Sequence, residues 1–140
     1  MSWNGHAAES PPQHIPGASF DTYTFNLSRA DGDGFYAGYA NRSLWPTLHD
    51  GVVPATLKSE WWEAYVEAAK AFALATAVAV DKVGARSTMW LHDYHLFLVP
   101  DLLRGKGVQN PLAFFLHTPF PSPTVFGRLP QRSELLRGLS

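Results

Sequence analysis

The chain has 140 residues, of which 46% are hydrophobic and 16% charged, so it has the size and composition of about one soluble domain. Its formal net charge is -1 and its lysines and arginines are scattered, which argues against a nucleic-acid partner or an anionic membrane surface. There is no cysteine, which excludes disulfides and thiolate metal sites. Residues 1–17 show no signal peptide and no apolar run is long enough to span a membrane, so we expect a cytoplasmic protein.

In the first 35 residues the sequence predicts one strand. Residues 1–19 combine three prolines and two glycines with no apolar periodicity, which predicts a loop or a disordered terminus. Residues 20–27 alternate apolar and polar side chains and predict a half-buried strand, after which Ser28 can cap a short helix. The segment 31–34 resembles the opening of a calcium loop, but Phe35 stands where the next acidic ligand is needed. We therefore expect a solvated turn there.

The segment 35–50 is dense in aromatic and amide side chains. Tyr36 and Tyr39 have helical spacing, which predicts a short helix packed by its aromatic rings in the first half of the segment. Pro46 should stop any helix just after Trp45, so a long helix is not expected. The functional alternative is that these rings form one wall of a sugar-binding site.

A long helix is predicted to begin after Ser59, which we expect to be its N-cap. Apolar residues, many of them alanine, recur at three- and four-residue steps as far as Val80. This stripe suits close packing on a sheet, and we assign it to the core because nothing in it carries chemistry. The segment 82–86 contains Gly84 and breaks the pattern.

Residues 89–121 have the pattern of a βαβ unit, in which two parallel strands are joined by a helix. The first strand is predicted at 88–91, and a helix over 94–103 should kink or restart at Pro100. The second strand, at 112–116, is apolar throughout, which is typical of a strand covered on both faces. A further short helix is indicated near the C-terminus.

Polar side chains follow both strands of this unit. His92 and Asp93 follow the first strand, and His117 follows the second. Ligands of open α/β sheets bind beyond the carboxyl ends of the strands, so these residues are candidates for one shared site.

The residue types narrow the chemistry of that site. Neither a complete zinc or iron motif nor a glycine-rich phosphate loop nor a nucleophile elbow is present, so we expect no metal and no cofactor. Carboxylate, imidazole and amide groups beside aromatic rings fit a carbohydrate site. The alternative from the residues alone is that the two histidines are structural.

Three motifs carry a resemblance to a known family. They are Tyr36 followed by Asn41-Arg42-Ser43-Leu44-Trp45-Pro46-Thr47-Leu48-His49, then Trp90-Leu91-His92-Asp93-Tyr94-His95-Leu96, then Phe114-Phe115-Leu116-His117-Thr118-Pro119-Phe120-Pro121. In order and spacing they resemble trehalose-6-phosphate synthases, which are retaining glycosyltransferases of the GT-B fold. The resemblance implies an α/β fold with an incomplete Rossmann-like parallel sheet and flanking helices. Residues 1–140 would form part of the acceptor-side, N-terminal domain.

The resemblance also implies a reaction and roles for four residues. Members of that family transfer glucose from UDP-glucose, or another nucleotide-glucose, to glucose 6-phosphate in trehalose biosynthesis. Tyr36 and Asp93 are similar to ligands of glucose 6-phosphate, Trp45 resembles a tryptophan that helps to select the anomer, and His117 resembles a histidine beside the donor sugar. The leaving phosphate helps to deprotonate the acceptor, so no protein nucleophile is needed. His92 and His95 would then have structural roles.

The resemblance covers only part of the family's length. The first strand with its glycine loop and the C-terminal domain that holds most of the nucleotide-glucose donor have no counterpart, so we expect a fragment without synthase activity of its own. An exposed sheet edge would make it marginally stable or a homo-oligomer. Two alternatives stay open: a pseudo-glycosyltransferase that couples cyclitols, and a non-catalytic module that binds sugar phosphate.

Overall fold

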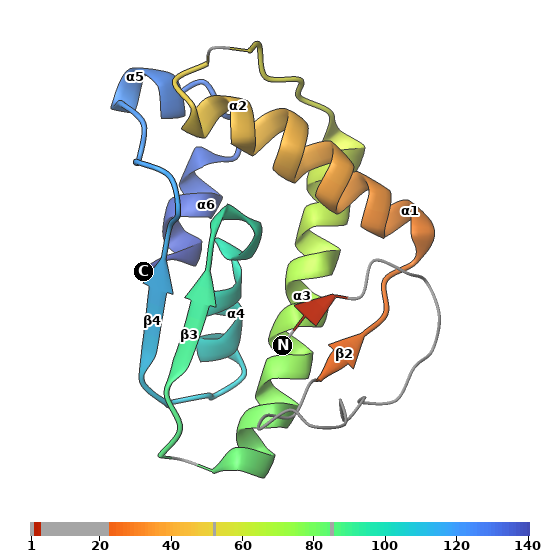
Figure 1. Cartoon of the computed structure of the whole chain (residues 1–140), viewed down its shortest axis with the longest axis vertical. Coiled ribbons are helices and arrows are strands. Elements are labelled where there is room, and N and C mark those ends of the chain that lie inside the picture. The colour runs from red at the N-terminus through yellow and green to blue at the C-terminus, as the bar shows by residue number, and fades with distance from the viewer. Residues whose placement is uncertain (1, 4–22, 52, 85) are drawn as a thin grey trace, which may run out of the picture.

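A computed structural model describes residues 2–3, 23–51, 53–84 and 86–140 of the chain (Figure 1). Within the predicted terminal loop, Ser2–Trp3 forms strand β1, which pairs in parallel with β2, Thr24–Phe25; residues 4–19 lie outside the described part. Of the strand predicted over 20–27, residues 20–22 also lie outside the described part, and the remainder contains the two-residue strand β2. Its ordering comes from a partner distant in sequence, which local alternation does not reveal.

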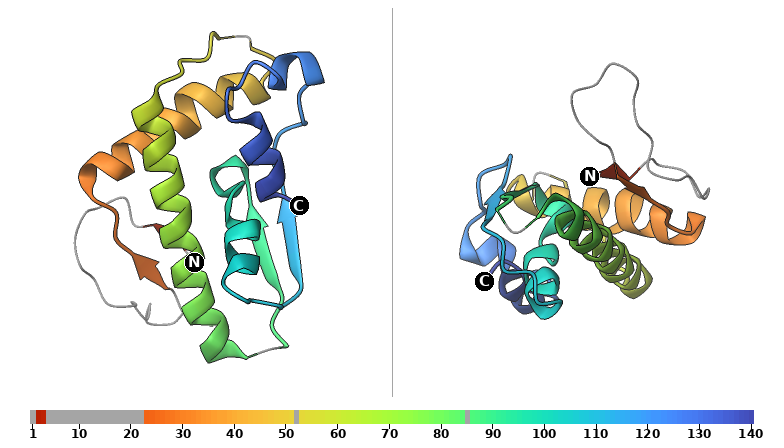
Figure 2. Two further views of the ribbon diagram at one scale, coloured as in Figure 1. Left: turned by 180° about the vertical axis from the view of Figure 1, so that it is seen from behind. Right: turned by 90° about the horizontal axis from the view of Figure 1, so that it is seen from below.

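Helix α3 (Ser59–Val83) is the longest element and runs between the other parts of the molecule (Figures 1 and 2). Its buried residues are the small Ala64, Ala68, Ala69 and Ala73 together with Tyr65, which confirms the predicted core stripe. The helix begins one residue earlier than predicted: Lys58 is the N-cap and makes no side-chain capping bond. It ends where expected, at Gly84, whose φ of 98° is open to glycine at little cost.

The predicted βαβ unit is confirmed beside α3. Strand β3 (Met89–His92) pairs in parallel with β4 (Leu112–Phe115), with Met89 opposite Leu112 and His92 opposite Phe115. The connection restarts at Pro100 as predicted: a 3-10 turn, η2 (Tyr94–Leu96), is followed by α4 (Val99–Gly105) with the proline in its first turn. The α/β class is confirmed, although the parallel strands form two separate pairs.

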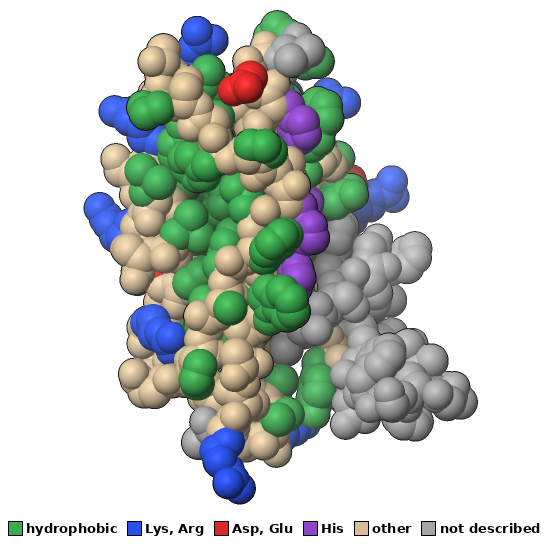
Figure 3. Space-filling model, turned by 60° about the vertical axis from the view of Figure 1, so that its left-hand side comes forward, with side chains coloured by type: hydrophobic (Ala, Val, Ile, Leu, Met, Phe, Trp, Pro, Cys, Tyr) green, Lys and Arg blue, Asp and Glu red, His purple; other side chains and the backbone are tan. Residues whose placement is uncertain are grey.

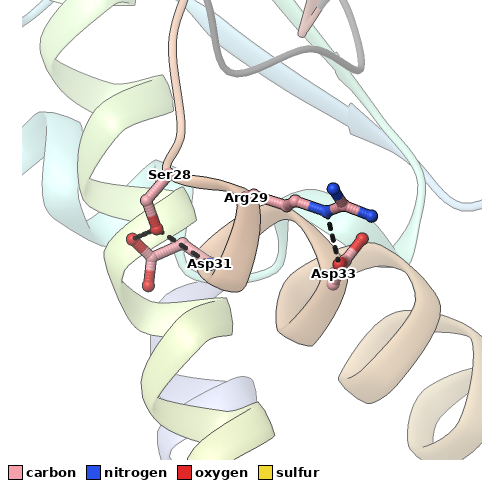
Figure 4. A network of polar contacts seen from close by, with 4 residues as sticks. All are labelled: Ser28, Arg29, Asp31 and Asp33. Atoms are coloured by element: carbon pink, nitrogen blue, oxygen red, sulfur yellow. Dashed lines mark hydrogen bonds and ion pairs between the residues drawn. The ribbon is translucent and has the colours of Figure 1, made fainter.

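A continuous helical stretch crosses α3 at one end (Figure 1). It begins with α1 (Arg29–Gly32), where the Ser28 hydroxyl accepts from the Asp31 N–H and so caps the helix as predicted (Figure 4). The Ser28 hydroxyl also donates to the Asp31 carboxylate at 2.6 Å, and Arg29 faces Asp33 at 3.8 Å. The prediction of a solvated turn at 31–34 is wrong because these contacts begin a helix there.

The helical stretch continues as a π-helix, η1 (Asp33–Leu44), and then as α2 (Trp45–Leu48). Our prediction that Pro46 ends the helix after Trp45 is wrong. In an α-helix the proline ring collides with the carbonyl four residues back. The chain entering Pro46 instead makes bonds to the fifth residue back, as the Trp45 N–H does to Ala40, and Pro46 stands in the first turn of α2.

Among the described residues, the sheet of β3 and β4 is covered on one face only. Met89 and Leu91 are buried toward α3 and α4, whereas Trp90 is 64% exposed and Phe115 48% exposed on the opposite face. Figure 3, seen with the β4 side brought forward, shows hydrophobic side chains gathered next to a row of histidines. The prediction of a strand covered on both faces is wrong: an apolar sequence shows that a strand can be buried, and the described residues supply no second layer.

The chain ends in two short helices, α5 (Pro123–Phe126) and α6 (Arg132–Gly138). The second agrees with the helix indicated near the C-terminus, and its Leu135 is fully buried. Gly138 lies so close to the backbone of Phe97 and Leu98 that a side chain there would displace one of them. The C-terminal helix therefore packs directly against the turn that follows the first strand of the βαβ unit.

Candidate substrate site

The carboxyl ends of β3 and β4 meet, and the structure places the candidate polar residues there. The N–H of Asp93 donates to the carbonyl of Phe115 at 2.7 Å, which ties the two strand ends together. His92 Nδ1 lies 3.1 Å from His117 Nε2, with the two rings stacked. One imidazole must donate and the other accept, so each fixes the tautomer of its neighbour.

Asp93 is held in an unusual conformation. Its φ of 74° and ψ of 166° lie in a region that non-glycine residues rarely occupy, at a cost of about 1–3 kcal/mol. The carboxylate accepts from the N–H of Tyr94 at 3.0 Å and so caps η2. Strained residues of this kind concentrate at binding and catalytic sites, where the surrounding structure holds them.

Tyr65, on α3, makes hydrogen bonds to the backbone of the turn that follows Asp93. Its hydroxyl donates to the Tyr94 carbonyl at 2.6 Å and accepts from the Phe97 N–H at 3.3 Å. The ring is fully buried, and burial raises the pKa of its phenol well above the ordinary value. Sequence reasoning placed Tyr65 in a core stripe without chemistry; a hydroxyl within an alanine-rich stripe was the signal that a buried polar partner was needed.

Tyr36 and Trp45 lie on the same helical stretch, nine residues apart. In an α-helix of 3.6 residues per turn this spacing puts them on opposite sides. Bonds to the fifth residue back give η1 more residues per turn than an α-helix, so nine residues come closer to two full turns and bring the two positions toward one face. Tyr36 is 48% exposed and Trp45 40% exposed. The π geometry thereby brings together two exposed rings, which we call the aromatic wall, where α-helical spacing would separate them.

That face of η1 contacts the turn after β3. The Tyr36 ring stacks on His95 with centroids 5.6 Å apart and an angle of 16° between planes. The Tyr94 hydroxyl lies 3.5 Å from Asn41 Oδ1. Tyr36 is thus joined through His95 to the turn that carries Asp93.

Trp45 extends the wall away from this turn. It stacks on His49 at 4.1 Å, and its carbonyl lies 2.8 Å from Nδ1 of the same histidine. Among the described interactions, none links Trp45 directly to Asp93 or His117. The structure therefore brings Tyr36 and Asp93 into one group, pairs His117 with His92 beside it, and places Trp45 further along the same wall.

Burial controls the ionisation of the groups behind the site. It lowers the pKa of His95, against an opposing effect of the Asp93 carboxylate. Burial raises the pKa of Tyr94 to about 12, with Asp93 contributing in the same direction. Near pH 7 His95 accordingly carries no positive charge and Tyr94 no negative charge.

Within the described ranges, no three His, Asp or Glu side chains are grouped so that they could hold a metal ion. No described helix is long and apolar enough to cross a membrane.

Comparison with known proteins decides the family. The sequence profile of Glycosyltransferase family 20 matches residues 6–140. The chain belongs to glycosyltransferase family 20. A trehalose-6-phosphate synthase of Mycolicibacterium smegmatis is 40% identical over 140 residues, which is 99% of this chain and 27% of that relative.

Solved family 20 structures share the fold. A UDP-forming alpha,alpha-trehalose-phosphate synthase from Burkholderia vietnamiensis matches with a TM-score of 0.86 and 32% identity, over 98% of this chain and 30% of that one. A synthase of the same description from Burkholderia xenovorans, in complex with glucose-6-phosphate, matches with a TM-score of 0.86 and 29% identity over the same shares. The chain spans under a third of the length of these family 20 relatives.

Proposed function

We propose that this chain forms the acceptor-side wall of a trehalose-6-phosphate synthase site, as part of a N-terminal domain that residues 1–140 do not complete. The observation that carries the proposal is the joining of Tyr36 to the strained Asp93 turn through the His95 ring. The two residues that we assign to glucose 6-phosphate come from different elements and are far apart in sequence. Their placement on one wall is what a shared ligand requires.

The two residues offer complementary groups to a sugar phosphate. The Tyr36 phenol can donate to phosphate oxygens, and the Asp93 carboxylate can accept from sugar hydroxyls. Family membership supports this assignment, because a family 20 relative has been solved in complex with glucose-6-phosphate.

His117 and Trp45 would face the donor side of the cleft. We propose that His117, oriented by His92, lies beside the glucose of a nucleotide-glucose, and that Trp45 contributes to the choice of anomer. UDP-forming relatives support UDP-glucose as the donor. In this scheme most of the nucleotide is held by those regions of family 20 proteins that lie outside this chain. The chain alone would then lack the charges that stabilise the departing phosphate.

Titration calorimetry with glucose 6-phosphate tests the acceptor assignment. The Tyr36→Phe, Asp93→Asn double variant should bind at least about tenfold more weakly, since hydrogen bonds to charged groups contribute roughly 1.5–3 kcal/mol. The matched control is Tyr23→Phe with Asp101→Asn, which makes the same chemical changes away from the site. Equal affinity of wild type and the double variant would refute the assignment.

A second assay tests catalysis. We infer that the chain alone does not form trehalose 6-phosphate from UDP-glucose and glucose 6-phosphate. Product above a no-protein control would contradict this. Binding without turnover would support an acceptor wall that needs the remainder of the family's fold.

A further inference from the structure

The ring of His95 lies between two tyrosine rings. Tyr94 stacks on it with ring centroids 4.2 Å apart and an angle of 26° between planes, and Tyr36 stacks on it with centroids 5.6 Å apart and an angle of 16°. Among the described ring contacts none joins Tyr36 to Tyr94, which places the two tyrosines on different sides of the imidazole. Phe35 meets the imidazole edge-on at 6.1 Å. The histidine is thus the middle member of a three-ring stack that joins η1 to η2.

The same histidine carries a buried nitrogen without a partner. His95 Nε2 is inaccessible to solvent and has no hydrogen-bond partner among the described residues. A neutral imidazole can leave this atom unprotonated at modest cost, whereas an imidazolium would bury a charged N–H with no acceptor. Attraction of a cation to the flanking π faces offsets only part of that desolvation.

The titratable groups around the ring agree with a neutral state. Asp93 precedes η2 and is the carboxylate that favours protonation of His95, while the phenols of Tyr36 on η1 and Tyr94 on η2 flank its faces. Burial outweighs the carboxylate and lowers the pKa of His95.

We propose that His95 is a positioning residue for acceptor binding: its neutral ring holds Tyr36 beside Asp93, and protonation of His95 loosens that arrangement. The proposal rests on the assignment of Tyr36 and Asp93 to glucose 6-phosphate. It gives a function to a histidine that otherwise only fills space. The sign follows from burial: the neutral stack persists above the ordinary histidine pKa of about 6.5 and is lost only on the acid side of it.

The first test needs no ligand. In the 140-residue chain, the Tyr36 ring protons should show ring-current shifts that are kept in His95→Phe and lost in His95→Ala. In wild type these shifts should disappear on acidification, and in His95→Phe they should not. The proposal would be overturned if the Tyr36 shifts were the same in wild type, His95→Phe and His95→Ala. It would also be overturned if they changed with pH alike in wild type and His95→Phe. If His95→Ala does not fold, the wild-type and His95→Phe titrations still decide it.

The second test measures glucose 6-phosphate affinity from neutral to acid pH. His95→Ala should weaken binding roughly three- to tenfold at neutral pH, the size expected for loss of an aromatic pair, and His95→Phe should restore it. The phosphate of glucose 6-phosphate itself titrates near pH 6. The affinity of His95→Phe therefore changes with pH through the ligand's phosphate but not through residue 95. The extra loss in wild type therefore reports His95.

The outcomes separate the two proposals. Equal affinity in wild type and His95→Ala would overturn the positioning role while the acceptor site stands. If wild type binds no glucose 6-phosphate, the proposed function fails for this chain, and the Tyr36 resonances still decide whether His95 holds the ring.

Discussion

The buried hydroxyl of Tyr65, in the middle of α3, donates to the carbonyl of Tyr94 at 2.6 Å, immediately after the strained Asp93. The same oxygen accepts from the Phe97 N–H. One side chain thus satisfies both a donor and an acceptor of the buried turn between β3 and α4.

Replacing Tyr65 by Phe should lower the free energy of unfolding by about 1–3 kcal/mol, because two buried backbone groups lose their partner. Tyr39→Phe is the matched control: that hydroxyl donates only to the partly buried Gln131 side chain at 3.0 Å. Urea unfolding should show the larger loss in Tyr65→Phe. A loss equal to or smaller than that of Tyr39→Phe would contradict this.

The local sequence predicted the elements whose signals are local. The α3 stripe, the stop at Gly84, the Ser28 cap and the restart at Pro100 follow from periodicity, φ preference and proline geometry. The passage through Pro46 was not predictable in this way. It depends on the π geometry of η1, which packs against α3 and which local periodicity does not reveal.

The site could be predicted from the sequence only in part, because local geometry brings some of its residues together and tertiary contacts bring the others. Parallel strands have their carboxyl ends together, so His92, Asp93 and His117 could be grouped from sequence. The alignment of Tyr36 with Trp45 requires the π turn, and the support from Tyr65 and His95 requires tertiary contacts. The residue types alone proposed Tyr36 and Trp45 for a sugar-binding wall, and the family resemblance then gave each of them a role.

Close packing of η1 on α3 depends on Gly38. A Cβ there would lie 2.7–2.9 Å from ring atoms of Trp61. Gly38→Ala should destabilise the chain by about 1–3 kcal/mol through overpacking, which exceeds the helix-propensity gain of up to about 1 kcal/mol. Gly105→Ala, at a helix position with nothing within 4 Å, should be neutral or slightly stabilising. Urea midpoints measure both, and a stabilised Gly38→Ala would show that Trp61 can move aside.

Alkaline pH should destabilise the folded chain at pH values below those at which its buried tyrosines ionise. The pKa of Tyr94 is about 12 in the folded chain and about 10 when unfolded, and burial also raises those of Tyr39 and Tyr65. The unfolded state therefore loses protons first, so this contribution is full below pH 10 and declines as the pH rises toward 12. Tyr94→Phe should make the fall in urea midpoint shallower across that range; an unchanged slope would contradict the assignment.

The outward face of β3 and β4 should cause self-association. Trp90 and Phe115 project from it, with the exposed Ala113 opposite Trp90 in the register, and none of these outward residues is charged. In the described part of the chain each strand also has one unpaired edge. Exposed apolar strands of this kind are templates for pairing between copies.

Sedimentation velocity over a range of concentrations tests this, with the 140-residue chain expected to show concentration-dependent association. Trp90→Thr with Phe115→Thr should shift it toward monomer, because threonine suits a strand and removes the apolar rings. The control, Val53→Thr with Leu57→Thr, removes two exposed apolar side chains elsewhere and should leave association unchanged. A wild-type chain that stays monomeric at all concentrations would show that two rings and two short edges are too little surface to join copies. Association reduced equally by both pairs would instead indicate general hydrophobic stickiness, with no role for the sheet face.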